Sequence, residues 1–228
     1  MALADYQALL GDLARDQAAV LTSDARARAL EAARLQYSAD QPRRMVDDVT
    51  WPAGALAPAP VGWTDSAWIQ RAEYPLGREP VALIDVSAYL SPTGWQIMAA
   101  DHVAAGGVVR VTFMAEHELS ATEDTIPARH RLAVAQYAAH LLCHQLATHY
   151  SAQRETSMGS DASLTETRAR EFAARSKELR AAYCAGVGIA DPFKATAVGN
   201  STGATAAAGV VSWPSRNPRH RLVQRGGL

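Results

Sequence analysis

Four of the seven histidines of this chain stand close together, at positions 130, 140, 144 and 149. His140 and His144 are four residues apart, so on a helix they share one face, and Cys143 lies next to His144; this spacing can hold zinc. The stretch "HLLCH" lacks the glutamate of a zinc-protease helix, however, and no third ligand accompanies it in an evident motif. A helix in a polar groove explains the two histidines as well. We therefore expect no bound metal and no cofactor.

A second candidate for chemistry is His117 in "MAEHELS", where Glu116 and Glu118 flank it. In a loop it can act as a general base, with Asp101 or Asp124 as the acid that orients it. The alternative, which we favour, is a loop histidine that satisfies a main-chain carbonyl. No serine or cysteine stands in the context of a nucleophile elbow, and "GVGIAD" follows a helical pattern rather than a strand, unlike a dinucleotide-binding loop. The sequence predicts no enzyme.

The length and composition of the chain limit the class of protein to which these residues can belong. The 228 residues, 48% of them apolar, suffice for one domain, or for one domain with an insertion. Cys143 and Cys184 both fall in helical patterns, which favours a reducing compartment over a disulfide framework. The N-terminus lacks the pattern of a signal peptide, and no apolar run is long enough to span a membrane. We expect a soluble chain.

Charge is distributed unevenly along the chain. The whole chain carries a formal charge of −1, but from residue 185 onward there are five Lys and Arg against one acid, which gives the tail +4. The first 184 residues therefore carry −5. A weakly acidic body with a basic tail indicates that the tail has a partner of its own.

Helical periodicity occurs at both ends of the part of the chain that precedes the tail. Residues 2–18 predict one helix, and a second begins after a cap at Ser23 or Asp24 and ends before Pro42. A long helix over about 128–152 is apolar on most sides, which is typical of the central helix of a bundle. Ser163 and Glu166 form a capping box for a further helix that runs to about Tyr183, with Gly186 as its stop.

Between these helices, residues 44–118 change to the pattern of β-strands. The candidate strands are "RMVDDVTW", "WTDSAWIQRAEYP", "VALIDVSAYL", "GWQIMAA" and "VVRVTFM". The last three are separated by short turns, so we expect them to be consecutive antiparallel neighbours. "PAGALAPAPVG" is expected to be a loop that lies over a surface. Because strands and helices are grouped rather than alternating, the fold class is α+β.

Four parts follow from these patterns. Residues 1–43 are the N-terminal helices of a bundle, 44–118 an inserted antiparallel β-domain, and 119–188 the two long helices that complete the bundle. Residues 189–228 are rich in Ala, Gly, Thr, Ser and Pro, and cannot bury enough apolar surface to fold alone. We expect them to form an extended basic arm.

The order of these segments resembles one known family. An N-terminal helix pair ends in "YSADQPRRMVDDV", a β-section runs from "IQRAEYPLGREP" through "VRVTFMAEHELS", and "TIPARHRLAVAQYAAHLLCHQLATHYS" leads to "RAREFAARSKELRAAYCAGVG". Over residues 1–188 this order is similar to that of the head–tail adaptor or connector (neck) proteins of long-tailed double-stranded DNA bacteriophages. The β-section is larger here than in the all-helical adaptors.

The resemblance implies a structural virion protein of the neck, assembled in the host cytoplasm. About twelve copies would form a ring under the portal protein, contact a downstream neck or tail protein through the β-section, and leave a channel for passing DNA without sequence-specific binding. The basic arm would hold the portal ring. Candidate portal-binding residues are Trp213, Arg216, Arg219, Arg221, Leu222 and Arg225, and candidate subunit-interface residues are Arg168, Glu171, Arg175 and Glu178.

Two alternatives remain open from the sequence. One is a different neck component, such as a stopper or a tail-completion ring. The other is a nucleic-acid-binding protein whose arm neutralises phosphates without recognising base sequence.

Overall fold

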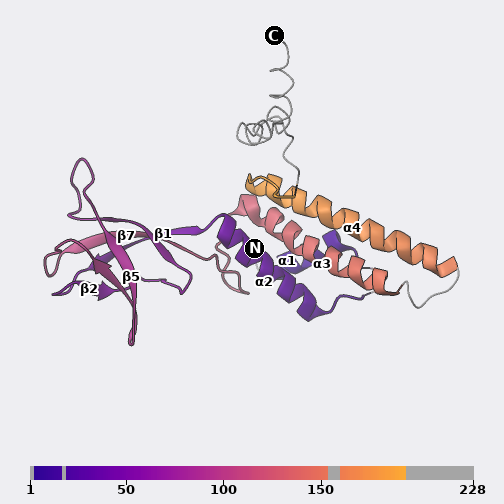
Figure 1. The fold of residues 1–228 in the computed structure, drawn as a ribbon, viewed down its shortest axis with the longest axis horizontal. Coiled ribbons are helices and arrows are strands. Elements are labelled where there is room, and N and C mark those ends of the chain that lie inside the picture. The colour runs from indigo at the N-terminus through magenta and orange to yellow at the C-terminus, as the bar shows by residue number, and fades with distance from the viewer. Residues whose placement is uncertain (1–2, 17–18, 154–159, 194–228) are drawn as a thin grey trace, which may run out of the picture. The chain divides into compact units, whose positions relative to one another are not determined.

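The computed structural model describes residues 3–16, 19–153 and 160–193, and its fold class is the predicted α+β (Figure 1). Two N-terminal helices are followed by two antiparallel sheets and two long packed helices. Met1–Ile189 form one compact unit, to which the description below refers. The division of the chain into four parts remains a prediction, and the arm residues 194–228 lie outside the described residues.

The N-terminal helices are α1 (Leu3–Ala14) and α2 (Ser23–Asp40). The residue that caps α2 is Thr22, one position before the predicted caps, and its Oγ1 accepts a hydrogen bond from the Ala25 N–H at 3.2 Å. This contact satisfies one of the main-chain donors that a helix N-terminus leaves without a partner. The helix ends at Asp40, just before Pro42, as predicted.

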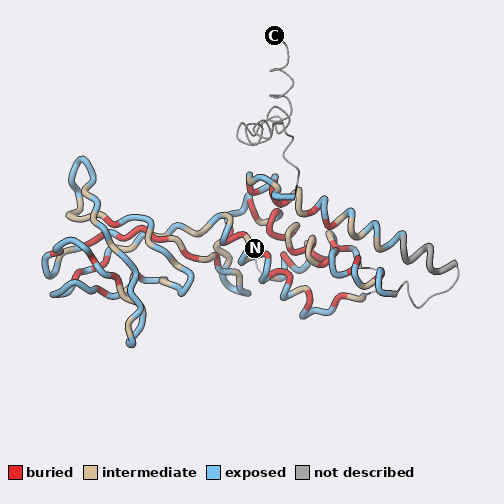
Figure 2. The backbone as a smooth tube through the Cα atoms, viewed as in Figure 1, coloured by how far each residue is buried: buried red, intermediate tan, exposed pale blue. Residues whose placement is uncertain are grey.

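The central helix of the bundle is α3 (Arg131–Gln153), which follows a 3₁₀ turn, η1 (Ala128–His130). It packs against α1, α2 and α4, which confirms the prediction of a central helix. Small fully buried residues, among them Ala138 and Ala139, let the neighbouring helices approach closely, and Figure 2 shows the buried positions along α3. Leu132, which fits the apolar pattern of this helix, is 51% exposed instead.

The last helix, α4 (Ser160–Val187), is longer than predicted at both ends. The side chains of Ser163 and Glu166 lie outside the described residues, so their capping box stays a prediction. Gly186 does not stop the helix; Gly188, with φ of +81°, follows its end, in a conformation that favours glycine. A Cβ atom at Gly186 would lie 3.0 Å from the Cβ of Ala133, so this glycine allows α4 to pack closely on α3.

The β-section contains seven strands in two sheets. The first sheet has the order β1-β7-β3-β4 and the second sheet has the order β2-β6-β5, and every pairing is antiparallel. The strands are β1 (Arg43–Thr50), β2 (Leu56–Pro58), β3 (Trp68–Glu73), β4 (Leu83–Ile84), β5 (Val86–Ser91), β6 (Gly94–Ala99) and β7 (Val108–Ala115).

All five predicted strand segments contain strands, but their predicted pairing is wrong in one respect. β5 and β6 form the expected hairpin, whereas β7 does not pair with β6; it pairs with β1 and β3. The expected loop at 52–62 contributes β2, which pairs with β6. Short connections favour pairing of strands that are neighbours in sequence. The two sheets, however, must also pack their inner faces together. Trp51, Ile97 and Phe113 are buried in this shared core, and their burial decides which strands pair.

Candidate interaction surfaces

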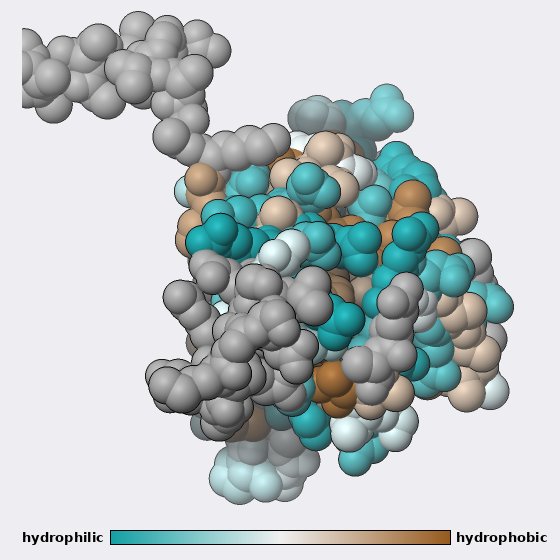
Figure 3. Space-filling model, turned by 90° about the vertical axis from the view of Figure 1, so that its right-hand side faces the viewer, coloured by the Kyte–Doolittle hydropathy of each residue, from teal (hydrophilic) through white to brown (hydrophobic). Residues whose placement is uncertain are grey.

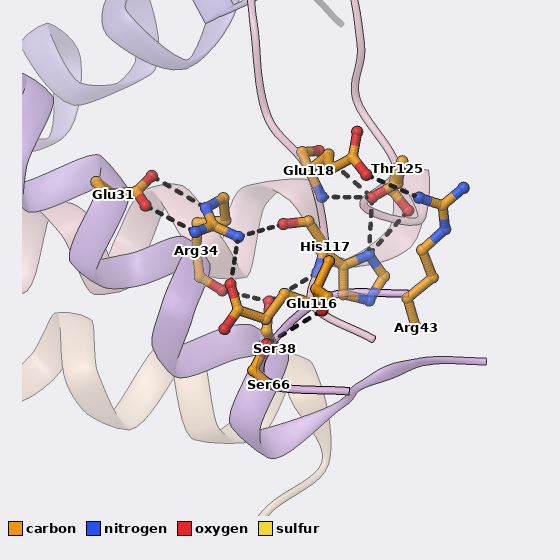
Figure 4. Close-up of polar contacts among 10 residues, drawn as sticks. Glu31, Arg34, Ser38, Arg43, Ser66, Glu116, His117, Glu118 and Thr125 are labelled. Carbon is orange, nitrogen blue, oxygen red and sulfur yellow. Dashed lines mark hydrogen bonds and ion pairs between the residues drawn. The ribbon is translucent and has the colours of Figure 1, made fainter. Parts of the chain in front are cut away.

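A polar junction ties α2 to the segment that follows β7 (Figure 4). The Arg34 guanidinium forms an ion pair with Glu31 on its own helix at 2.7 Å and another with Glu116 at 3.2 Å. It also donates a hydrogen bond to the main-chain carbonyl of His117. Because Arg34 reaches residues about 80 positions away in the chain, it fixes the end of β7 against the helical bundle.

His117 lies at the centre of this junction and is 4% exposed. Its Nδ1 is 3.0 Å from the carbonyl oxygen of Thr125, and its Nε2 is 3.0 Å from that of Gln41. Burial lowers the pKa of the His117 imidazole, although the contacts with these two carbonyls act in the opposite direction. In the neutral imidazole one nitrogen donates and the other accepts, so Nε2–H can donate to the Gln41 carbonyl while Nδ1 accepts from the Thr125 hydroxyl at 3.2 Å. The favoured alternative, a histidine that satisfies a carbonyl, is confirmed.

A second histidine of the junction is also held internally. His130 is buried, and its Nδ1 lies 2.6 Å from the hydroxyl of Tyr37 on α2. Burial lowers the pKa of His130, with the neighbouring charge of Arg129 adding to the effect. The Tyr37 ring also packs on His117, with 5.0 Å between ring centroids. These two histidines are therefore part of the packing between the elements.

The two histidines of the suggested zinc pair have different surroundings. His140 faces α4, where its Nδ1 lies 2.8 Å from Ser176 Oγ and 2.9 Å from Ser176 O, whereas His144 is exposed. Within the described parts of the chain, no group of three His, Cys, Asp or Glu side chains is placed to hold a metal ion. Cys143 and Cys184 are free and buried, and burial raises the pKa of Cys143 to about 11.

The four candidate subunit-interface residues lie along one stripe of α4, because their spacing of three and four residues follows the helical period. Arg168, Glu171 and Glu178 are exposed and Arg175 is half-buried. The Arg168 guanidinium lies over the ring of Tyr150 on α3, 5.9 Å from its centroid. This end of the helices presents a mainly hydrophilic surface with isolated apolar residues (Figure 3). The role of the four charged α4 residues between subunits stays a prediction.

The six candidate portal-binding residues of the arm lie outside the described residues. Their role rests on the sequence alone, and the structure adds nothing to it.

A hollow of about 290 Å³ lies where the end of α2 meets the first sheet. Trp68 and Met114 line it from neighbouring strands, and they are directly paired in the sheet register. Leu35 and Pro42 line it from the α2 side. Trp68 and Leu35 are 52% and 44% exposed, so the apolar wall of this hollow is open to solvent. Sequence analysis missed it because its residues come from three separate segments.

Exposed apolar side chains concentrate in the β-section. Of the thirteen large hydrophobic residues that are exposed in the described chain, ten lie between residues 46 and 108. Isolated exposed apolar residues are normal on a protein surface, whereas contiguous patches of them mark contact surfaces, so the β-section is the candidate region for such a patch. The ten are Val46, Leu56, Val61, Trp68, Val81, Leu83, Tyr89, Leu90, Met98 and Val108.

No protein-family model matches this chain, and no curated protein matches it. None of the helices in the described residues is long and apolar enough to cross a membrane.

Proposed function

We propose that the protein is a non-catalytic structural component of a bacteriophage neck, which assembles as a ring and joins the portal of the head to the tail. The observation that carries the proposal is the concentration of ten exposed large apolar residues in the β-section. A subunit of an assembly needs such surface, because contacts between proteins are formed by apolar residues surrounded by polar ones. The internal contacts of His117 and His140 also support the proposal.

The ring itself is inferred from the resemblance of the segment order to phage neck proteins. The stripe of Arg168, Glu171, Arg175 and Glu178 supplies mixed charges for contacts between neighbouring copies, about twelve in number. In a closed ring, one face of each subunit contacts a different face of the next subunit. The positive and negative residues of the stripe would therefore pair with opposite charges on that different face. The portal protein would bind the arm, and the next neck or tail protein would bind the β-section.

Double-stranded DNA would pass through the centre of this ring. The −5 charge of the first 184 residues suits a channel that does not hold the phosphates of passing DNA. No cofactor takes part in this function, and the protein would reside in the neck of the virion after assembly in the host cytoplasm. A stopper or tail-completion ring uses the same surfaces and is the closest alternative.

The proposal is tested by capture of the portal ring encoded in the same genome. The full chain is compared with a version that ends at Phe193, which keeps Ile189 packed against the helical core. The proposal expects that only the full chain captures the portal. Equal capture by both versions would remove the arm from the contact, and failure of both would move the protein toward the tail or refute the neck position.

Salt dependence separates the portal from nucleic acid as the partner of the arm. Binding to phosphates falls linearly with salt concentration on logarithmic axes. A portal complex anchored by Trp213 and Leu222 would persist at high salt. A further version with Trp213→Ala, compared with Arg216→Ala, shows whether the apolar anchor or the charge carries the binding.

A further inference from the structure

On the side away from β6, β5 has no hydrogen-bonded partner strand among the described residues, although β3 of the first sheet lies close to it. β5 is the last strand of the second sheet, and its register with β6 is continuous from Val86 to Ser91. The four residues 87–90 are all exposed, with Tyr89 44% and Leu90 62% exposed. An exposed edge strand presents main-chain N–H and C=O groups that can pair with another strand.

The other sheet edges in the described chain carry features that prevent such pairing. β1 bears Arg43, Arg44, Asp47 and Asp48, and the Asp47 carboxylate accepts a hydrogen bond from the Val61 N–H of the adjacent loop. β2 has three residues and ends in a proline, and β4 has two residues. Charges, prolines and short length are the usual means by which proteins protect sheet edges. β5 has six residues and none of these features.

The strands of the second sheet are also uncharged, although the exposed Asp85 precedes β5 and Asp65 accepts a hydrogen bond from Trp95. No residue of β2, β5 or β6 has a charged side chain, whereas β1, β3 and β7 of the first sheet all carry charges. On one face of the second sheet, Leu56 and Met98 are direct neighbours in the register and both are exposed. On the other face, Leu90 stands opposite Trp95. At the free edge the face of Met98 carries Ser87, Tyr89 and Ser91, so it is uncharged but partly polar, whereas the face of Leu90 is apolar and continues to the buried Ile97.

We propose that β5 pairs antiparallel with β5 of a second copy of this chain, across a two-fold axis, to form a continuous six-stranded sheet. A two-fold contact uses the same surface of both copies, and a charge at the residue on the axis would meet a like charge. β5 is compatible with itself because it has none. The remaining described edges offer a neighbouring copy no suitable strand, which leaves β5 itself as the partner. This contact does not use the α4 stripe of the proposed ring, but it does use Tyr89 and Leu90 of the β-section, so the next neck or tail protein would bind other residues of that section.

Only some registers between the two β5 strands are possible, and this restriction can be tested. Two copies of a strand keep their side-chain faces aligned only when a residue lies on the axis and meets its own counterpart. The central candidates are Ala88, Tyr89 and Leu90. Cross-strand contacts would then involve alanine, tyrosine, leucine and serine side chains, and none of these pairs places like charges opposite each other.

The test uses the full-length protein with one added cysteine, introduced by substitution. Each variant is treated with a short bis-maleimide cross-linker. Ala88→Cys, Tyr89→Cys and Leu90→Cys are compared with Val46→Cys, which is a control because Val46 is 56% exposed on β1. The two native cysteines are buried and remain in place. We expect at least one β5 variant to give several times more covalent dimer than the control. Equal yields, or none from the three β5 variants, would overturn the proposal.

A second comparison addresses the strand pairing itself. Leu90→Lys places a charge on the edge, and Leu132→Lys places one on α3, where Leu132 is 51% exposed against 62% for Leu90. Each lysine is added to the β5 cysteine variant that gives the most covalent dimer. Leu90→Lys should then lower the dimer yield to that of Val46→Cys. If position 90 holds the cysteine, Tyr89→Lys takes its place. Leu132→Lys should leave the yield unchanged. Unchanged yields with both lysines would mean that the cross-link reports a contact other than strand pairing.

Discussion

The phenolic hydroxyl of Tyr183, near the end of α4, donates a hydrogen bond to the carboxylate of Asp40 at the end of α2. Gln36 donates to the same carboxylate at 3.1 Å. Burial, together with the contact to Asp40, raises the pKa of Tyr183, so the hydroxyl remains a donor. The bond joins two residues that are 143 positions apart in the chain, next to the point where the chain enters β1.

Replacing Tyr183 by phenylalanine should lower the free energy of unfolding by about 1.5–3 kcal/mol, the range for a hydrogen bond to a charged group. The change removes only the hydroxyl, and the ring stays buried in the helical core. Urea denaturation measures the loss. The matched control is Tyr89→Phe, because Tyr89 is 44% exposed on β5 and should change stability little. Equal effects of both changes would argue against the contact with Asp40.

Three glycines should respond to alanine in different ways. Gly11 in α1 has open space around it, so Gly11→Ala should raise the free energy of unfolding by about 0.5–1 kcal/mol through helix propensity. Gly186→Ala gains the same propensity but places a methyl group 3.0 Å from Ala133 Cβ, so it should stabilise less than Gly11→Ala or destabilise. Gly188→Ala should cost about 1 kcal/mol, because φ is +81° there. Thermal unfolding of the three variants gives the order, and stabilisation by Gly186→Ala equal to that by Gly11→Ala would contradict the close packing of α3 and α4.

Stability should fall as the pH drops below about 6.5, the ordinary pKa of histidine that His117 and His130 have in the unfolded chain. Burial lowers both pKa values in the folded state, so the unfolded chain binds more protons in this range and unfolding becomes easier. The charges that act on His117 are those of Arg43, which lowers its pKa, and Asp124, which raises it. Urea denaturation at pH 7.5 and at pH 5 measures the difference. An unchanged or higher stability at pH 5 would show that the two imidazoles are not held neutral.

Reversing charges on the α4 stripe should weaken the proposed ring. Glu171→Lys and Glu178→Lys change exposed residues, so the subunit should fold normally while contacts between copies become repulsive. An exposed ion pair contributes about 0.2–1 kcal/mol, and every boundary between subunits would lose it. Native mass spectrometry measures the ring population. Lys177→Glu, an exposed change on another side of the same helix, is the control, and an intact ring in the double variant would place the subunit contact elsewhere.

Much of the helical architecture was predictable from the sequence. The 3.6-residue pattern predicted α1, α2, α3 and α4, because a helix hydrogen-bonds within its own segment and its apolar face is visible in local spacing. The central position of α3 followed from its apolar character on most sides. The structural role of His117 was predictable as well, although its particular carbonyl partners, Thr125 and Gln41, were not.

The pairing of the strands and the surfaces it creates were decided by the tertiary structure. Strand partners are distant in sequence, and the alternating pattern of β7 does not say whether it lies beside β6 or between β1 and β3. The packing of two sheets around a shared apolar core settles that choice. It also leaves β5 at an edge and brings Trp68, Met114 and Leu35 to one hollow. Local sequence determines which segments form helices and strands, whereas non-local burial determines which of their faces remain exposed.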